Sequence, residues 1–174
     1  MNLFTILMDE DVVSSINDNL DYLLDVIPEI KYMIGFEHRN PDHHLDVWNH
    51  TLYALSLSEM DFEIRLCLLL HDIGKPFSYT EGEIRHFNGH QEVSARMSDA
   101  ILRRLGFDEN FVQEVCYLIR NHDMPLSKKE IERSHSLAMK RYLIQYCDCL
   151  AHHPEKLEKR KAYLVKIKRL LVNQ

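Results

Sequence analysis

Apolar residues recur every three or four positions along most of the chain, which is the spacing of one face of an α-helix. In residues 9–27 this pattern predicts one helix with an acidic polar face. Pro28 suits the first position of a short second helix, and Gly35 suits its end. The same spacing predicts six further helices, over residues 47–60, 62–72, 89–105, 109–121, 135–153 and 155–172.

Side chains that can accept a hydrogen bond from free main-chain N–H groups stand where several of these helices should begin. The expected N-caps are Asp46, Asp61, Asn88 and Asp108. Ser127 and Glu130 have the spacing of a capping box. Residues 36–46 should form a polar loop and residues 77–87 a turn or small hairpin. Since no segment reads as a convincing strand, we predict an all-α protein, a single compact multi-helix bundle.

The 174 residues are 45% hydrophobic, which is enough for one globular domain with a buried core. A formal net charge of −6 argues against general attraction to nucleic acid. The charge is uneven, because residues 1–30 hold seven acids and no Lys or Arg, whereas residues 155–174 hold seven bases and two acids. The two terminal helices should therefore lie near each other or be solvated, and a basic face along an RNA is the alternative for the C-terminal one.

The sequence also indicates a cellular compartment. No apolar run approaches the roughly 18 residues of a membrane span. Residues 1–8 lack the basic positions that open a secretory signal. The four cysteines lack Cys-x-x-Cys spacing, which fits small core residues in a reducing environment. We expect a cytoplasmic location and no membrane partner.

Eleven histidines are present, and several stand where helices should end or face inward. His71-Asp72 closes the apolar run 66–70, where a carboxylate is costly to bury unless it is paired or ligated. The other inward or helix-end candidates are His50, His90, His122 and Asp148. Any one of them alone is more often a hydrogen-bonded core residue. Together they indicate a metal centre, whose imidazole and carboxylate ligands suit Mn, Fe, Co, Ni or Zn better than Ca.

The order of His50, His71-Asp72 and Asp148 resembles the H…HD…D signature of the HD-domain metal-dependent phosphohydrolases, and the string LLHDIGKP at residues 69–76 is highly specific for that family. Further stretches are similar to the HD domain attached to bacterial tRNA nucleotidyltransferases: DVWNHTL (46–52), FNGH (87–90) and LIRNH (118–122). The resemblance covers residues 28–153. It implies a single HD domain over residues 1–174, with the acidic helix 9–27 and the basic helix 155–172 packed on that core. The nucleotidyltransferase head motif is absent, so we expect a free-standing HD domain.

The resemblance also implies a set of ligands. One divalent ion would be held by His50, His71, Asp72 and Asp148. Asp72 would bridge to a second ion held by His90 and His122. We expect one or two ions of Mn, Fe, Co, Ni, Zn or Mg. The catalytic candidates are Asp72, Lys75 and Arg120, the two cations as contacts to phosphate, with a surface side chain as the alternative for each.

The expected activity is metal-dependent hydrolysis of a nucleotide-type phosphomonoester or phosphodiester, including 2′,3′-cyclic nucleotides, on a small molecule or an RNA end. A dinucleoside polyphosphate hydrolase is one alternative, and a non-catalytic nucleotide- or metal-binding module that acts through a partner is another. Two other subfamilies fit less well. The Gly-Tyr-Pro motif of the cyclic-dinucleotide phosphodiesterases is missing, and residues 73–75 lack the acidic pair of the alarmone hydrolases.

Substrate specificity should reside in the loops 36–46 and 77–88. Within the first loop, Arg39, His43 and His44 are expected to be solvated rather than to shape the entry to the site. His152 follows Asp148 by one helical turn and should support it by hydrogen bonding.

Overall fold

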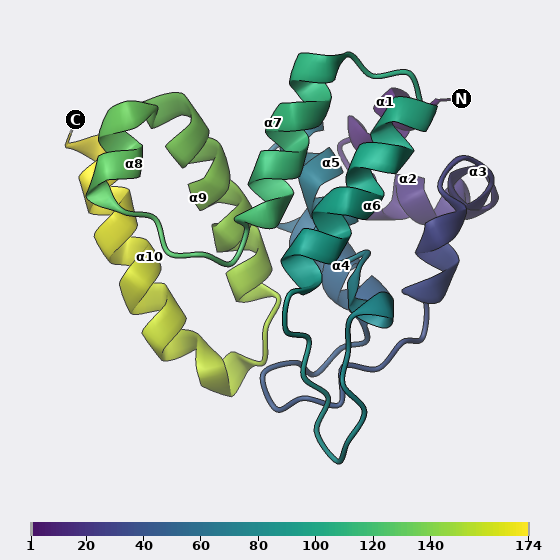
Figure 1. The fold of residues 1–174 in the computed structure, drawn as a ribbon, viewed down its shortest axis with the longest axis horizontal. Helices are drawn as coiled ribbons and strands as arrows, with labels where there is room; N and C mark the ends of the chain where they lie inside the picture. Colours follow the sequence, from purple (N-terminus) through teal and green to yellow (C-terminus); the bar gives the residue numbers. More distant parts are fainter. Residues whose placement is uncertain (1, 174) are drawn as a thin grey trace.

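The computed structural model describes residues 2–173 and confirms the all-α prediction: its regular elements within that range are helices, together with two isolated β-bridges (Figure 1). The α-helices are α1 (Leu3–Leu7), α2 (Val12–Asp18), α3 (Leu20–Val26), α4 (Val47–Ser56), α5 (Phe62–Leu70), α6 (His90–Arg104), α7 (Glu109–Arg120), α8 (Lys128–Arg133), α9 (His135–Leu150) and α10 (Leu157–Val172). Short 3-10 turns occupy Pro28–Tyr32, Lys75–Phe77 and Pro154–Lys156. No helix in the described range is both long and apolar enough to cross a membrane.

Most of the expected helix starts are confirmed. The carboxylates of Asp46, Asp61 and Asp108 each accept a hydrogen bond from the main-chain N–H three residues later. The Ser127–Glu130 capping box is also present. The expected cap at Asn88 is wrong. Gly89 occupies the cap position of α6 with φ +78°, a left-handed conformation that glycine adopts without strain, so the helix begins directly at His90.

The predicted single helix over residues 9–27 is wrong. Its chain forms α2 and α3, which Asn19 separates with φ −120° and ψ 23°. The Asn19 side-chain amide donates to the Ser15 carbonyl at 2.8 Å and so satisfies a group that a continuing helix would have bonded. The break leaves Ile16 and Leu23 fully buried. At the other end, the helix expected over 155–172 starts as the turn Pro154–Lys156 before α10.

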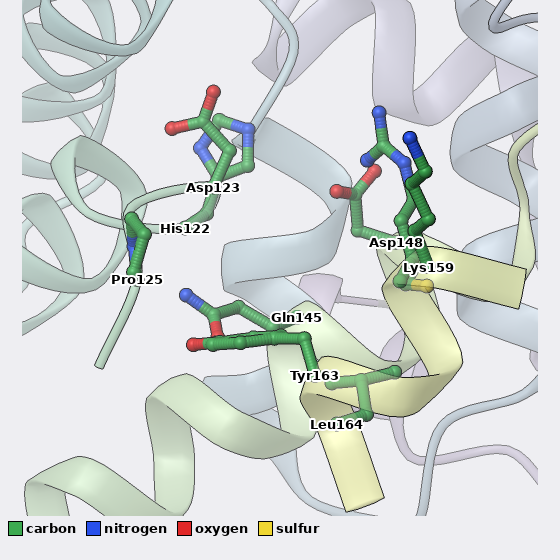
Figure 2. A pocket seen from close by; sticks show the side chains of 10 residues that line it. His122, Asp123, Pro125, Gln145, Asp148, Lys159, Tyr163 and Leu164 are labelled. Carbon is green, nitrogen blue, oxygen red and sulfur yellow. The ribbon is translucent and has the colours of Figure 1, made fainter. Parts of the chain in front are cut away.

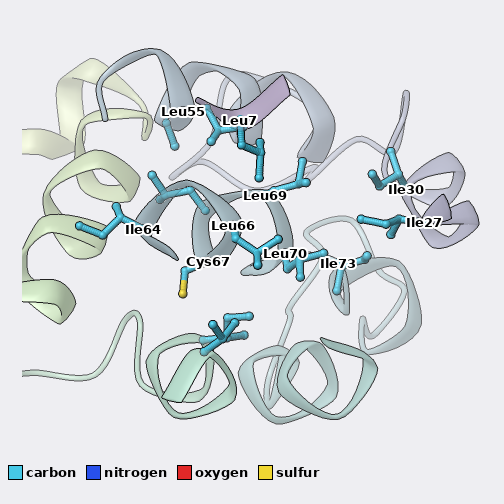
Figure 3. Packing of buried hydrophobic residues seen from close by; sticks show 14 of the residues in the cluster. Leu7, Ile27, Ile30, Leu55, Ile64, Leu66, Cys67, Leu69, Leu70 and Ile73 are labelled. Carbon is cyan, nitrogen blue, oxygen red and sulfur yellow. The ribbon is translucent and has the colours of Figure 1, made fainter. Parts of the chain in front are cut away.

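The core surrounds α5, whose last five residues are all apolar, as suits a helix in the middle of a protein. Residues 66–70 of this helix have no solvent exposure. Figure 3 shows α5 enclosed by the helices that pack around it, with Leu7 and Leu55 on one side and Ile27 and Ile30 on another. A second cluster of apolar residues lies between α8, α9 and α10, the group on the left of Figure 1. The carboxyl end of α5 therefore lies where the two groups of helices meet.

The two loops that precede α4 and α6 pack on each other at the bottom of Figure 1. The Arg85 guanidinium donates to the Glu37 carbonyl at 2.7 Å, and the Asn40 amide donates to the Arg85 carbonyl at 3.1 Å. The turn expected over 77–87 contains an isolated antiparallel bridge between Thr80 and His86. These contacts hold both loops beside the end of α5.

Candidate metal centre

The six residues expected to bind metal come together in one buried cluster, and five helices supply them. His71 and Asp72 directly follow α5, and His122 lies two residues past the end of α7. His90 is the first residue of α6. The remaining two are His50 on α4 and Asp148 on α9. Helix ends suit such a site because a side chain there can leave the helix axis, so neighbours such as His71 and Asp72 can face one point.

The four candidate histidines share one orientation. Each ring places Nδ1 against a main-chain carbonyl: His71 on Leu68 at 2.7 Å, His90 on Phe87 at 2.9 Å, His122 on Ile119 at 2.7 Å and His50 on Ala151 at 3.2 Å. A carbonyl oxygen can only accept, so Nδ1 of each ring carries the proton when the ring is neutral. Each Nε2 is then left with a lone pair that faces the cluster, which is the arrangement of a metal-ligating histidine.

Asp72 stands in the middle, and its two carboxylate oxygens face different histidines. Oδ2 lies 3.3 Å from His71 Nε2 and 3.7 Å from His50 Nε2. Oδ1 lies 3.3 Å from His90 Nε2 and 3.9 Å from His122 Nε2. These are two groups of potential ligands that share only Asp72, so the carboxylate has the geometry of a bridge.

Asp148 closes the first group from the side of α9. Its Oδ1 lies 2.9 Å from His50 Nε2 and 3.5 Å from His71 Nε2. His50 and Asp148 are 98 positions apart in the chain, and both are buried. The structure therefore puts Asp148 where it can complete a four-residue set with His50, His71 and Asp72.

The donor atoms of this cluster fit a divalent cation. Asp72 and His71 have no solvent exposure, yet both Asp72 oxygens and His71 Nε2 lack a hydrogen-bond partner among the described residues. Lys75 Nζ lies 2.7 Å from Asp72 Oδ2 but off the direction of a hydrogen bond, so that contact is an ion pair. Buried carboxylate oxygens without donors are costly. A cation ligated by these oxygens and by imidazole nitrogens would remove that cost.

The electrostatics of the cluster are dominated by its two carboxylates. Burial works to lower the pKa of His71, but Asp72 and Asp148 raise it to about 10. Burial works to raise the pKa of Asp72, but His71 and Lys75 hold it well below its usual value. For His122, burial and the neighbouring His71 lower the pKa to about 4. The cluster thus holds two anionic carboxylates in a dry environment, where the protonated His71 and Lys75 balance their charge. A metal ion that binds there would take the place of the proton on His71.

Lys75 faces the centre, and His38 fixes it there. Lys75 is buried, and its ammonium lies 3.0 Å from His38 Nε2. His38 Nδ1 donates to the Leu45 carbonyl at 2.7 Å, so its Nε2 is free to accept from Lys75. Burial and Lys75 together lower the pKa of His38 to about 2, which keeps the ring neutral. Sequence reasoning gave His38 no role, because the loop that carries it has no periodicity from which its direction could be inferred.

His43 is also part of this region, against the expectation that it would be solvated. Its ring stacks on His38 with centroids 3.8 Å apart and approaches the His152 ring at 4.4 Å. His43, His50 and His152 form a third group whose nitrogen atoms lie close enough together to share an ion. His152 donates from Nδ1 to the Asp148 main-chain carbonyl at 2.8 Å, and the same nitrogen lies 3.8 Å from Asp148 Oδ1.

Arg120 is not brought to the cluster. It lies on the outer face of α7, with 45% of its side chain exposed, and its Nε donates to Glu92 at 2.6 Å. The expected contact between Arg120 and phosphate therefore has no support in the geometry. Arg120 still belongs to α7, so the helix fixes the direction of its side chain. His122 lies beyond the end of the helix and turns inward.

A cavity of about 370 Å³ opens directly onto the centre. Its wall includes His90, His122, Asp148 and Lys75 from the cluster, together with His43, His86 and His152 and the residues of the two packed loops. Arg160 from α10 also lines this cavity. A ligand in this cavity would meet candidate metal ligands together with the cations Lys75 and Arg160.

Comparison with known proteins places the chain in a family. The sequence profile of the HD domain matches residues 42–166, which is more than half of the chain and includes all six candidate ligands. The chain belongs to the HD domain family. HD domains bind divalent metals, and the His/Asp cluster of this HD domain could hold one.

Two curated relatives of this HD domain are tRNA nucleotidyltransferases. The CC-adding tRNA nucleotidyltransferase of Thermus thermophilus is 36% identical over 118 residues, which cover 62% of this chain and 27% of the relative. The A-adding tRNA nucleotidyltransferase of Deinococcus radiodurans is 30% identical over 131 residues, which cover 70% of this chain and 30% of the relative. The matched part is less than a third of each relative's length.

Proposed function

We propose that this HD domain is a metal-dependent phosphohydrolase that acts on a nucleotide-type phosphomonoester or phosphodiester. One observation carries the proposal. Both oxygens of Asp72 and Nε2 of His71 are buried without hydrogen-bond partners among the described residues, and the neighbouring ligand candidates His90, His122 and Asp148 line a cavity that is large enough for a small ligand. Such atoms are the mark of a cation site, and a cation beside a polar cavity suits a phosphate ester.

His50, His71, Asp72 and Asp148 would hold one ion, and Asp72, His90 and His122 would hold a second. A divalent ion bound there supplies an activated water at neutral pH and neutralises charge on phosphoryl oxygens. The residues of the chain hold this arrangement rigid, because the main-chain carbonyls fix the rings and the apolar end of α5 excludes bulk water.

Lys75 is the residue that we expect to contact the phosphate. Its ammonium lies 2.7 Å from Asp72 Oδ2, 3.0 Å from His38 Nε2 and 3.4 Å from His43 Nε2, and Lys75 lines the cavity. A phosphoryl oxygen would take the place of the long contact to His43. The positive charge is fixed before substrate arrives and lies where negative charge develops in the transition state. No role is proposed for Arg120.

The substrate class follows from the site and from the relatives. The cavity offers cations at Lys75 and Arg160, which suit an anionic ligand. Both relatives are named for an activity on tRNA, so an RNA end is one substrate to test beside free nucleotides. The substrate panel should therefore contain nucleoside monophosphates, 2′,3′-cyclic nucleotides, dinucleoside polyphosphates and oligoribonucleotides with a terminal phosphate.

The test is hydrolysis of this panel by metal-stripped protein to which Mn²⁺, Co²⁺, Ni²⁺, Zn²⁺ or Mg²⁺ is returned. We expect activity with at least one metal and its loss in His71→Ala combined with Asp72→Ala. The matched control is His44→Ala combined with Asp18→Ala, because both residues are exposed, neither belongs to the ligand groups and neither lines the cavity. Activity that survives the first double variant would refute the site, and inactivity with every metal would refute the function.

A further inference from the structure

A second cavity lies beside the first, on the side of α10. It has a volume of about 250 Å³, and Figure 2 shows its walls. His122, Asp123, Asp148 and Arg160 line both cavities, so the two adjoin at the metal centre. The first cavity, of about 370 Å³, already falls within the ~300–1,000 Å³ that is usual for small-molecule pockets, and the second adds a compartment beside it.

One part of the wall of the second cavity presents an aromatic ring and an aliphatic side chain. Tyr163 and Leu164 of α10 face Gln145 of α9, as Figure 2 shows. The Tyr163 hydroxyl accepts from Leu126 N–H at 2.8 Å and donates to Gln145 Oε1 at 3.0 Å. Because these polar atoms already bond each other, the wall offers a ligand mainly apolar contact with an aromatic ring held in one orientation.

Positive charge lies at the mouth of this cavity. Lys159 and Arg160 stand one helical turn before Tyr163 and Leu164, so all four share one face of α10. Arg160 lines both cavities and so stands at their junction. The acids Asp123 and Asp148 also line the junction, and Asp148 already faces the candidate metal ligands. The site therefore combines a cation at the junction with an apolar compartment beyond it.

We propose that this second cavity is the nucleoside subsite, in which the base of a nucleotide lies against Tyr163 and Leu164 while the phosphate lies at the metal centre. The position of the phosphate rests on the function proposed above. Bases stack on aromatic rings with a gain of about 1–3 kcal/mol each, which is enough to make the nucleoside part bind. The α10 helix then selects substrates through Tyr163 and Leu164 and attracts their phosphate through Arg160.

Binding tests the proposal without turnover. Isothermal titration calorimetry of the full chain, with and without Mn²⁺, compares AMP with inorganic phosphate. We expect AMP to bind about tenfold or more tightly than phosphate, the factor that 1.4 kcal/mol of base contact gives. In Cys149→Phe, which fills the cavity from its α9 wall, AMP should bind no more tightly than phosphate. The control Lys166→Ala changes an exposed residue of α10 that does not line the cavity and should leave both affinities unchanged.

A second measurement avoids dependence on the folding of Cys149→Phe. In the wild-type protein, AMP should shift the NMR resonances of the Tyr163 ring, identified with Tyr163→Phe, and inorganic phosphate should not. An oligoribonucleotide that shifts the same resonances identifies an RNA end as a source of the nucleotide, and AMP alone identifies a free nucleotide. Equal affinities for AMP and phosphate, or unmoved Tyr163 resonances, would overturn the subsite.

The two proposals can fail separately. If AMP binds as expected but no ester is hydrolysed, the subsite stands and the hydrolase function falls. If the protein hydrolyses p-nitrophenyl phosphate and nucleotides with equal kcat/KM, and Cys149→Phe leaves that ratio unchanged, the hydrolase function stands and the subsite falls.

Discussion

Gly74 shows how one residue positions the centre. Its φ of −84° is available to any residue, so the reason for glycine here is space rather than backbone freedom. A Cβ at this position would lie 2.5 Å from the Ser94 main-chain nitrogen and 3.0 Å from the His90 carbonyl. Gly74 also donates its own N–H to the Ser94 hydroxyl at 2.9 Å. The turn after Asp72 and the first turn of α6 therefore touch through their backbones.

Gly74→Ala should lower the free energy of unfolding by about 1–3 kcal/mol, the usual range for overpacking. It should also weaken metal binding, because α6 must move and carries His90 with it. Chemical denaturation and metal titration measure the two effects. Gly89→Ala is the control: its φ of +78° makes it strained, but no atom lies within 4 Å of the added Cβ. A Gly74→Ala protein that binds metal like the wild type would contradict this interpretation.

His38 acts through Lys75, so its substitution should affect turnover more than substrate binding. In His38→Asn, the amide can keep the bond to the Leu45 carbonyl but is too short to reach Lys75. We expect kcat to fall about tenfold, less than the roughly 10²–10⁴-fold that loss of a catalytic group itself costs, because Lys75 is still present. His38→Gln extends its amide oxygen toward Lys75 and should restore part of the rate, which a merely structural role would not explain. Steady-state kinetics with unchanged metal content distinguish these outcomes.

The residues of the metal cluster were accessible to sequence reasoning, because the LLHDIGKP string and the extra histidines have fixed spacing. The positions of His38 and His43 beside Lys75 could not be inferred from the sequence, because both lie in a loop and meet Lys75 only after the chain has folded. Arg120 shows the opposite case. Its nearness to His122 in sequence suggested nearness in space, whereas the end of α7 separates their directions.

At the scale of elements, Arg141 holds the chain between α7 and α8 against α9. This arginine is 1% exposed, and it donates to the Met124 carbonyl at 2.8 Å and to the Asn121 carbonyl at 3.1 Å. Its other terminal nitrogen donates to Glu130 at 2.6 Å. The loop that it holds carries His122 and Pro125, which line the proposed subsite.

Arg141→Met should destabilise the protein by about 2–4 kcal/mol, because it leaves buried carbonyls without donors. Arg141→Lys keeps the charge but cannot reach both carbonyls and Glu130. Its free energy of unfolding should therefore lie between those of Arg141→Met and the wild type. Thermal or urea unfolding measures the difference. Equal stability of the Lys variant and the wild type would show that charge alone is what matters here.

The ion pair between Arg141 and Glu130 should make the stability of the protein depend on pH. Partial burial would raise its pKa, but hydrogen bonds from Ser127 and the charge of Arg141 lower it below 4.5. A lowered pKa in the folded state stabilises the protein above the unfolded value, near 4.5, and this stability is lost as pH falls through the folded value. Glu130→Gln should therefore be less stable than wild type at pH 7, and the difference in free energy of unfolding should become smaller as the pH is lowered from about 5 to 3. If urea unfolding showed a difference that grows in acid, the lowered pKa of Glu130 would be contradicted.

The helices themselves were largely predictable from local chemistry. Asp46, Asp61 and Asp108 cap as their side chains suggest, because an N-cap is satisfied within three residues. The break at Asn19 was not predictable, since the apolar spacing continues through it. What ends α2 is a competing side-chain bond whose benefit depends on burying Ile16 and Leu23 in the tertiary fold.

At the scale of the whole molecule, the candidate metal centre is the place where distant parts of the chain meet. Its ligands come from α4, the ends of α5 and α7, the start of α6, and α9. The family resemblance already implied that Asp72 serves both groups, but which of its oxygens faces which histidines depends on the packing of all five helices. The cavity along α10 was equally invisible, because Tyr163 and Gln145 have no shared motif.

Because its ligands belong to five helices, a bound ion should stabilise the fold as a whole. An ion at 100 times its Kd that binds only the folded chain adds about 2.7 kcal/mol to the free energy of unfolding. For a domain of this size that corresponds to roughly 5–10 °C in Tm. Chelation of the metal-loaded protein should therefore lower Tm by this amount, and return of the metal should restore it, as differential scanning calorimetry can measure.

Substitutions in the two ligand groups should show how much of this metal-dependent stabilisation each group provides. Asp72→Asn removes the residue that both groups share, so its Tm should not respond to chelation or to added metal. His90→Ala removes a ligand from one group only, and about half the metal content and part of the Tm shift should remain. Asp123→Asn is the control, because this exposed acid lines the cavity without joining either group, and its Tm should respond as in wild type. If His90→Ala and Asp72→Asn lose metal and Tm shift equally, the two groups form one indivisible site and Asp72 is not a bridge.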